Sequence, residues 1–308
     1  MHPPILRPWM RAAALAAMLA AFAHGCRDTQ PVAAARPEDS MAVMSYNLRQ
    51  FRFADRDRDG QEDDFKPENE IQPLLELVAE AQPDILAVQE LGDAATITLL
   101  QQRLRGAGID FPHIDHVIGP NPHATLGILS RHPIVKREPA TNQFYSIKGR
   151  SFPVQRGFQI VDVDVPGAFT VTVINVHLKS KVFHEAGQTE MRRNEARLLA
   201  SLVRRLAETD PARRLIVCGD FNDAPPSAAM REVWEGTPLT DLPLTDRYGD
   251  GWTHYYRHEQ SHGRIDYMLV NEPMRALWIP ERSGVVRDQR TYAASDHRPL
   301  VSVFRARD

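Results

Sequence analysis

Cysteines, long apolar runs and an excess of one charge are all scarce in this sequence. Its 308 residues include two cysteines, so one disulfide at most can form and a disulfide framework is excluded. Cys218 ends the apolar run 215–217 and is expected to be a small buried side chain. The formal net charge of −3 gives no overall attraction to polyanions, so a nucleic-acid ligand would need a local basic groove or a metal ion.

An apolar stretch near the N-terminus, Ala12–Ala23, is too short to span a bilayer comfortably. Two arginines precede it and small residues follow, which is the pattern of an export signal. The segment Ala23–Cys26 is similar to a lipoprotein signal, although His24 departs from the usual small residue. Lipid attachment through Cys26 and a soluble exported form therefore stay open. The remaining alternative is an N-terminal helix that packs on the domain.

We accordingly expect residues 1–26 to be a signal peptide or lipoprotein signal, 27–40 a flexible linker and 41–308 one domain, in the periplasm or at the cell surface. Helical periodicity appears at 71–79 and again at 192–207. The apolar runs of strand length are Met41–Tyr46, Ile85–Val88, Thr125–Leu129, Phe158–Val165, Phe169–Val176, Leu215–Cys218, Ile265–Val270 and Leu300–Phe304. This alternation predicts an α/β fold in which two sheets pack together with helices outside.

A short acidic segment follows the first predicted strand. Asp55, Asp57, Asp59 and Gly60 copy the start of a calcium-binding loop, which places oxygen ligands at alternate positions before a glycine. The twelfth position is Lys66, where such a loop has a bidentate glutamate. A Ca²⁺ site and a plain solvated loop are both open, and the lysine favours the plain loop.

Polar side chains stand where several predicted strands end, and a rigid sheet often presents catalytic groups at such positions. They are Asn47, Glu90, His177, Asp220, Asn222, Asp266, Asp296 and His297. Each alone has a plain alternative, such as a helix cap or a buried histidine. Together their carboxylate and amide oxygens suit Mg²⁺ or Mn²⁺, and the lack of a cysteine cluster makes zinc less favoured.

Six ordered motifs between residues 41 and 305 resemble those of the endonuclease/exonuclease/phosphatase superfamily. They are Met44–Arg49, Gln89–Glu90, Asn175–Leu178, Gly219–Asn222, Arg264–Tyr267 and Ser295–Pro299. The resemblance implies a four-layer α/β sandwich, in which two mixed β-sheets flanked by helices carry the active site at one edge. It also implies hydrolysis of a phosphate ester by in-line attack on phosphorus.

The resemblance further implies roles for these residues in metal binding. Glu90 would be the principal ligand of Mg²⁺ or Mn²⁺, with Asn47 beside it and Asp296 in support. Three cations near the ends of the motifs would bind phosphate groups of the substrate. They are Arg49, Arg156 and Lys179. Solvated surface charges are the alternative for these three cations.

The remaining positions would perform the chemistry. Asp220 would orient or deprotonate the attacking water, and Asn222 would help hold it. His177 would bind a phosphate oxygen or assist the leaving oxygen. His297, oriented by Asp266, would contact the scissile phosphate, and nearby carboxylates should raise the pKa of its imidazole. Whether Asp220 or the His297–Asp266 pair is the general base stays open.

Two positions bear on the substrate. Apurinic-site endonucleases resemble this sequence but have an acid at the position of Arg49 and a tyrosine at that of His177, so that activity is not favoured. An exported nuclease acting on DNA or RNA is the first expectation, and a monomer is expected. The alternatives are a phosphatase or phosphodiesterase for a small or lipid phosphate, and a surface-tethered binding protein without turnover.

Overall fold

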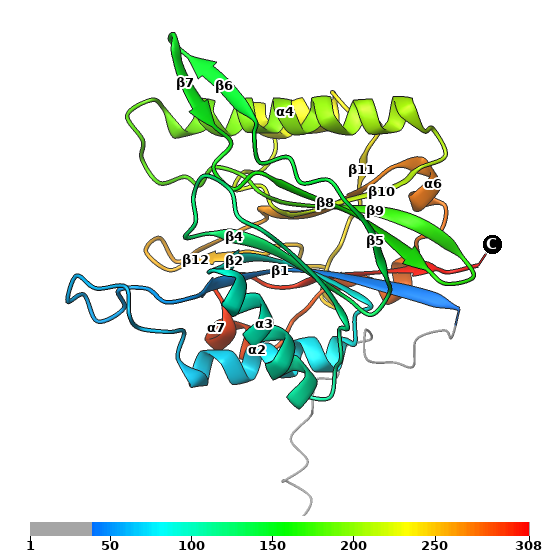
Figure 1. Ribbon diagram of the computed structural model, residues 1–308, viewed down its shortest axis with the longest axis horizontal. Helices are drawn as coiled ribbons and strands as arrows, with labels where there is room; N and C mark the ends of the chain where they lie inside the picture. The colour runs from blue at the N-terminus through cyan, green and yellow to red at the C-terminus, as the bar shows by residue number, and fades with distance from the viewer. Residues whose placement is uncertain (1–38, 308) are drawn as a thin grey trace, which may run out of the picture. The chain divides into compact units, whose positions relative to one another are not determined.

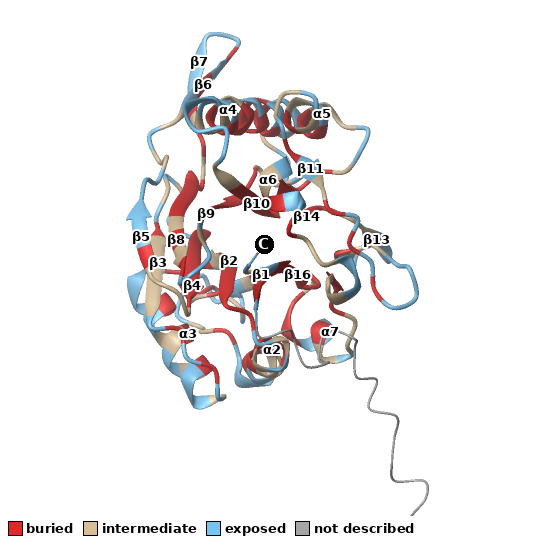
Figure 2. Cartoon of the chain, turned by 90° about the vertical axis from the view of Figure 1, so that its right-hand side faces the viewer, coloured by how far each residue is buried: buried red, intermediate tan, exposed pale blue. Residues whose placement is uncertain are grey.

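The computed structural model describes residues 39–307, which form two stacked β-sheets between two layers of helices (Figures 1 and 2). The first sheet has the order β15 (Gly284–Val285), β16 (Leu300–Arg305), β1 (Ser40–Phe51), β2 (Ile85–Leu91), β4 (Thr125–Ser130) and β3 (His113–Val117). The second has the order β11 (Thr240–Asp241), β14 (Asp266–Val270), β10 (Arg214–Asp220), β9 (Phe169–His177), β8 (Phe158–Val165) and β5 (Ile134–Arg137). Each sheet is mixed, because β1–β2 and β9–β10 are parallel and the other pairs are antiparallel.

Helices cover the outer face of each sheet (Figure 2). On the first sheet lie α2 (Glu68–Ala81), α3 (Ala94–Gly106) and α7 (Arg290–Ala294), and on the second lie α4 (Gln188–Thr209) and α5 (Ala228–Trp234). The short α6 (Glu272–Arg275) and a 3₁₀ turn at Pro280–Arg282 join the last strands. The predicted four-layer α/β sandwich is confirmed. Within the described range, no helix combines the length and hydropathy that a bilayer crossing requires.

Three hydrophobic clusters fill the three interfaces of this sandwich. One joins the two sheets and contains Val43, Ala87, Val173 and Cys218, so the predicted burial of that cysteine is confirmed. The others lie under the helix layers on either side. The central strands are therefore buried on both faces, which explains why they are continuous apolar runs in the sequence.

A buried polar network also joins the sheets. Asn175 on β9 accepts a hydrogen bond from Gln89 Nε2 on β2 (2.7 Å) and donates to the backbone carbonyls of Val88 (2.9 Å) and Gly127 (3.1 Å). Its amide also donates to Gln159 on β8 (3.0 Å). All three amide side chains are fully buried. Because buried amides are costly unless paired, this network favours one alignment of the two sheets.

Two small hairpins extend from the sandwich. β6 (Phe144–Ile147) and β7 (Arg150–Pro153) project beyond α4 (Figure 1), and β12 (His254–Tyr256) pairs with β13 (Ser261–Gly263). Phe144 is exposed, but Tyr145, Ile147 and Phe152 are buried against the core, so the hairpin packs mostly by its apolar face.

Gly219 on β10 lies so close to β9 that no side chain fits. A Cβ there would stand 2.0 Å from the Val176 carbonyl oxygen, and its φ of +136° is one that other residues avoid. We expect Gly219→Ala to lower the free energy of unfolding by at least about 2 kcal/mol. Gly149→Ala is the matched control, because its φ is also positive but the space is open, and it should cost roughly 1 kcal/mol. Urea unfolding of both variants measures the difference, and equal costs would contradict the expectation.

Candidate active site

The predicted site residues converge at one end of the two sheets, and each sheet supplies half of them. The first sheet contributes Asn47 in β1, Glu90 in β2, and Asp296 and His297 just before β16. The second contributes His177 and Asp220, which end β9 and β10, Asn222 directly after β10, and Asp266, which begins β14. Contacts of 4.0 Å or less connect all eight side chains.

Asp220 lies at the centre of this cluster. Its Oδ2 accepts hydrogen bonds from the amides of Asn47 and Asn222, both at 3.1 Å. The same oxygen lies 3.5 Å from Nε2 of His177 and 3.8 Å from Nε2 of His297, so both imidazoles face one carboxylate. Burial, reinforced by the negative charge of Asp266, raises the pKa of Asp220 to about 7. A carboxyl group with such a pKa is suited to exchange a proton with a water molecule.

His297 is fixed by Asp266. Its Nδ1 lies 2.8 Å from the nearer Asp266 oxygen, which leaves Nε2 directed at Asp220. Thr253 in turn accepts the backbone N–H of Asp266 at 3.1 Å. Burial opposes the charged imidazole, but Asp266, Asp220 and Asp296 outweigh it and raise the pKa of His297 to about 10. His297 is therefore a cation at neutral pH, as expected from the sequence.

His177 has the opposite character. Burial lowers its pKa well below the ordinary value, and the positive charges of Arg156 and His297 add to this. Its Nδ1 is buried and has no hydrogen-bond partner within residues 39–307. The cluster thus places a neutral imidazole and an imidazolium on either side of one carboxylate. In such a pair, the neutral imidazole can exchange a proton with one oxygen of a substrate, and the imidazolium can neutralise negative charge on another.

Glu90 and Asn47, the two predicted metal ligands, lie side by side. Asn47 Nδ2 donates to Glu90 Oε1 at 3.1 Å, and the Gln50 N–H donates to Oε2 at 2.9 Å. The Asn47 oxygen accepts the Arg49 N–H, so its amide nitrogen faces the carboxylates. Glu90 has a φ of +65°, a strained conformation that is typical of functional sites. The oxygens of the Glu90 carboxylate suit Mg²⁺ or Mn²⁺, and Asn47 holds Glu90 in place. The supporting role of Asp296 at this ion stays a prediction.

The three predicted phosphate-binding cations lie in different surroundings. The Arg49 side chain is 32% exposed and its Nε is 3.8 Å from Asp296 Oδ2, at the open side of the cluster. Arg156 is buried, and its guanidinium donates to the Leu178 carbonyl beside His177. Lys179 donates to Ser180 and to the Val182 carbonyl, so its ammonium stays with its own loop. Arg49 is thus the cation best placed to meet a phosphate.

Two residues of this region were not predicted from the sequence. His254 on β12 stacks near His297, with ring centroids 4.6 Å apart. Glu195 on α4 is fully buried and accepts the backbone N–H groups of Lys179 (2.6 Å) and Gln155 (3.3 Å), which fixes the chain beside His177. Glu195 could have been found from the sequence, because it is an acidic residue on the face of a predicted helix that packs inward. His254 gave no signal, because only the folded hairpin brings it to the site.

The acidic segment forms a loop in which carboxylate oxygens of Asp55, Asp57 and Asp59 lie within 4.8 Å of one another. All three residues are exposed, and Lys66 is buried and pairs with Glu70 (2.9 Å), so it offers no ligand. The calcium site stays a prediction. If it forms, Ca²⁺ should raise the melting temperature, and replacing the three aspartates by asparagine should abolish the shift while Mg²⁺-dependent turnover survives. Scanning calorimetry with and without Ca²⁺ decides, and no shift in the unsubstituted protein identifies a plain loop.

Comparisons with known proteins agree with this geometry. The profile of the Endonuclease/Exonuclease/phosphatase family matches residues 44–297. Together with the site, this match defines an enzyme that hydrolyses phosphate esters. The chain belongs to the Endonuclease/Exonuclease/phosphatase family, in which dependence on a divalent metal ion is typical. A search of curated proteins found no match.

Solved structures show the same fold. An endonuclease/exonuclease/phosphatase from Beutenbergia cavernae DSM 12333 has a TM-score of 0.61 and 21% identity, over 88% of this chain and 72% of that chain. Truncated Caenorhabditis elegans TDP2 has a TM-score of 0.56 and 18% identity, over 87% and 98% of the two chains. D. rerio TDP2 complexed with a single strand DNA product has a TM-score of 0.58 and 14% identity, over 87% and 99%.

Proposed function

We propose that the protein is a nuclease, a divalent-metal-dependent phosphodiesterase that cuts DNA or RNA. The observation that carries the chemistry is the meeting of His177 and His297 at one oxygen of Asp220. Asp220 and Asn222 hold the attacking water, and the carboxyl with its raised pKa receives the proton. The His297 cation neutralises charge that develops on the phosphate oxygens, and neutral His177 hydrogen-bonds the phosphate or the leaving oxygen. A metal ion at Glu90 would add further neutralisation of the phosphate charge.

A nucleic-acid substrate is supported by the segment that follows His177. Lys181 is exposed there, and the side chain of Phe183 is 82% exposed. A cation beside an exposed aromatic ring is the pairing that proteins use to hold a phosphate and stack a base. Arg49 offers a second cation on the open side of the site. The structural likeness to a DNA-bound TDP2 supports the same choice.

The alternative substrate is a small or lipid phosphate, and the same loop favours it in one respect. Val182 and Phe183 are both strongly exposed and would equally suit contact with a lipid surface. A panel of substrates with Mg²⁺ separates the two. It contains plasmid DNA, single-stranded RNA, sphingomyelin vesicles, inositol phosphates and para-nitrophenyl phosphates. Preference for a nucleic acid supports a nuclease, and preference for vesicles or small phosphates contradicts it.

Phe183→Ala sharpens this test. If the ring stacks on a base, the variant should lose about tenfold in kcat/KM on single-stranded nucleic acid and little on para-nitrophenyl phosphates. Phe53→Ala is the matched control, because Phe53 is also exposed but belongs to the chain before the acidic loop. Equal losses on both kinds of substrate would contradict a stacking role.

We also propose that the protein is exported. The sequence supports this through residues 1–26, which lie outside the described residues together with the linker up to residue 38. Expression of the full chain, cell fractionation and intact mass of the mature protein test the proposal. A mature chain that begins at a lipidated Cys26 identifies the membrane-tethered form. An unprocessed chain in the cytoplasm contradicts export.

A further inference from the structure

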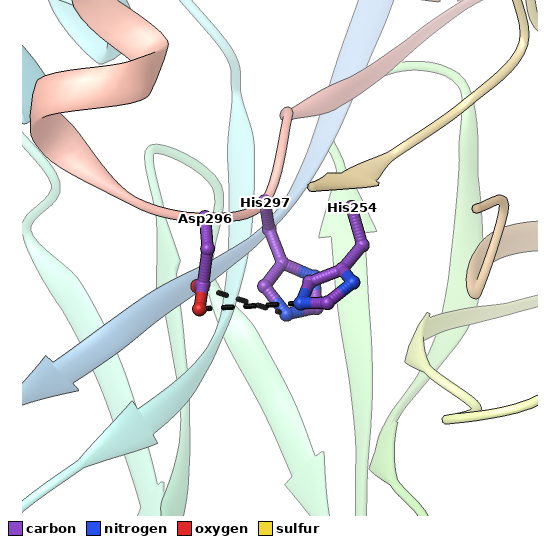
Figure 3. Close-up of side chains that lie close together, drawn as sticks. All are labelled: His254, Asp296 and His297. Carbon is purple, nitrogen blue, oxygen red and sulfur yellow. Dashed lines mark ion pairs between the residues drawn. The ribbon is translucent and has the colours of Figure 1, made fainter. Parts of the chain in front are cut away.

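Beside the Glu90 position lies a second group of potential ligands with different chemistry. His254, Asp296 and His297 each direct one ligand atom at a shared space, and these atoms lie within 4.8 Å of one another. Nε2 of His254 is 3.9 Å from Asp296 Oδ2, and Nε2 of His297 is 4.0 Å from Asp296 Oδ1. Figure 3 shows the two rings side by side with the carboxylate facing both.

The backbone holds this group together. The β12 strand runs beside residues 296–298, where the Tyr255 N–H donates to the Asp296 carbonyl at 2.9 Å and the Arg298 N–H donates to the Thr253 carbonyl at 2.6 Å. His254 and His297 form the β-bridge between these two contacts. The backbone pairing therefore holds the two imidazole rings next to each other, with their centroids 4.6 Å apart.

We propose that His254, Asp296 and His297 form a site for a transition-metal dication such as Zn²⁺, next to the Mg²⁺ or Mn²⁺ position at Glu90 and in competition with it for Asp296. Two imidazole nitrogens and one carboxylate are a ligand set that zinc and its neighbours bind well, whereas Mg²⁺ prefers oxygen alone. The Asp266 carboxylate binds Nδ1 of His297, which is the outer partner that metal-binding histidines usually have. The Asp296 side chain is 30% exposed, so solvent reaches the fourth position.

Occupation of this site would inhibit the enzyme. His297 is the cation that meets the phosphate in the proposed function. A metal ion that binds its Nε2 must displace the proton from that nitrogen into solvent, and it then occupies the atom that faces the phosphate. Zinc would thus withdraw one of the two histidines from the reaction while leaving Glu90 free. The inhibition rests on the proposed function, but the binding of the ion does not.

The test compares the protein with His254→Ala and with the matched control His258→Ala. His258 lies in the turn of the same hairpin, is exposed and is outside the group. Metal-free protein is titrated with Zn²⁺ by calorimetry and with Co²⁺ by visible absorption, both in excess Mg²⁺. We expect about one ion per chain and a tetrahedral Co²⁺ spectrum. His254→Ala should weaken binding at least about tenfold, and His258→Ala should leave it unchanged.

Turnover is then measured with and without Zn²⁺ at saturating Mg²⁺, and the ratio of the two rates is compared. Zn²⁺ should lower the rate of the unsubstituted protein and of His258→Ala, and it should lower the rate of His254→Ala much less. Equal Zn²⁺ affinity in the protein and His254→Ala would overturn the site, because the ion would then lie elsewhere. Binding without inhibition would leave the site intact and contradict the role of His297 in the proposed function.

Discussion

Glu90→Gln should lower turnover by at least about 10³-fold while the protein stays folded. Glutamine keeps the shape of the side chain and can still accept one of the two hydrogen bonds that Asn47 and the Gln50 N–H donate, but it lacks the negative charge that a divalent ion requires. Steady-state rates in saturating Mg²⁺ measure the effect, and circular dichroism with a melting curve confirms the fold. Glu138→Gln is the control, because Glu138 directly follows β5, is exposed and pairs with Lys136 at the surface.

Removal of the metal ion should also abolish turnover. Activity should vanish in excess EDTA and return with Mg²⁺ or Mn²⁺, since carboxylate oxygens dominate the Glu90 position. Glu90→Gln should need a higher metal concentration for half its residual rate, whereas Glu138→Gln should match the unsubstituted protein. Full activity in EDTA would refute the metal-dependent mechanism.

His177→Ala and His297→Ala should each lower turnover at least about 10²-fold. Both imidazoles contact the same Asp220 oxygen, so both serve one transition state, and the double variant should lose less than the product of the single losses. Single-turnover rates on the best substrate measure the cycle. His123→Ala is a control because that histidine is exposed and lies by Glu62. A His177→Ala enzyme with unchanged turnover would remove that residue from the site.

The two histidines also differ in their expected pH dependence. Asp266 is the main source of the raised pKa of His297, so Asp266→Asn should lower that pKa from about 10 and move the alkaline loss of activity to lower pH. The folded pKa lies above the unfolded value, so the ion pair stabilises fully below the unfolded pKa of about 6.5, and this stability is lost as pH rises toward 10. Urea unfolding of metal-free protein across this range measures it. An unshifted profile in Asp266→Asn would contradict the pairing.

Much of the fold was predictable because its central strands are buried on both faces. The run Phe158–Val165 coincides with β8, and the other runs identify strands to within a few residues. Asn47 was expected just after its strand, but β1 continues to Phe51 through an irregularity in its pairing with β2. Arg49 and Gln50 take positive φ values there, and no apolar pattern marks such a stretch. The helix α3 was missed because its apolar residues are gathered on one face less clearly than those of α4.

Site residues that belong to a sequence motif could be predicted, whereas residues that reach the site only through tertiary contacts could not. His297 and Asp266 could be paired only through the family resemblance, and the structure gives them a distance of 2.8 Å. The roles assigned to the individual residues stay predictions until variants are measured. His254 could not be found from its own neighbourhood, because the β12–β13 hairpin must fold back onto residues 296–298 before it faces His297.

The buried amides between the sheets separate two properties that are usually lost together, namely staying folded and keeping the site in register. Each sheet carries half of the reacting groups, so a slide of one sheet by a fraction of an ångström misaligns the histidines on Asp220 without exposing any core. Asn175→Leu would keep the volume and remove the directional contacts that select a single alignment. Such a variant would still melt as one domain, although at a lower temperature because the buried amides of Gln89 and Gln159 lose a partner, and its loss of activity would report on the alignment of the sheets.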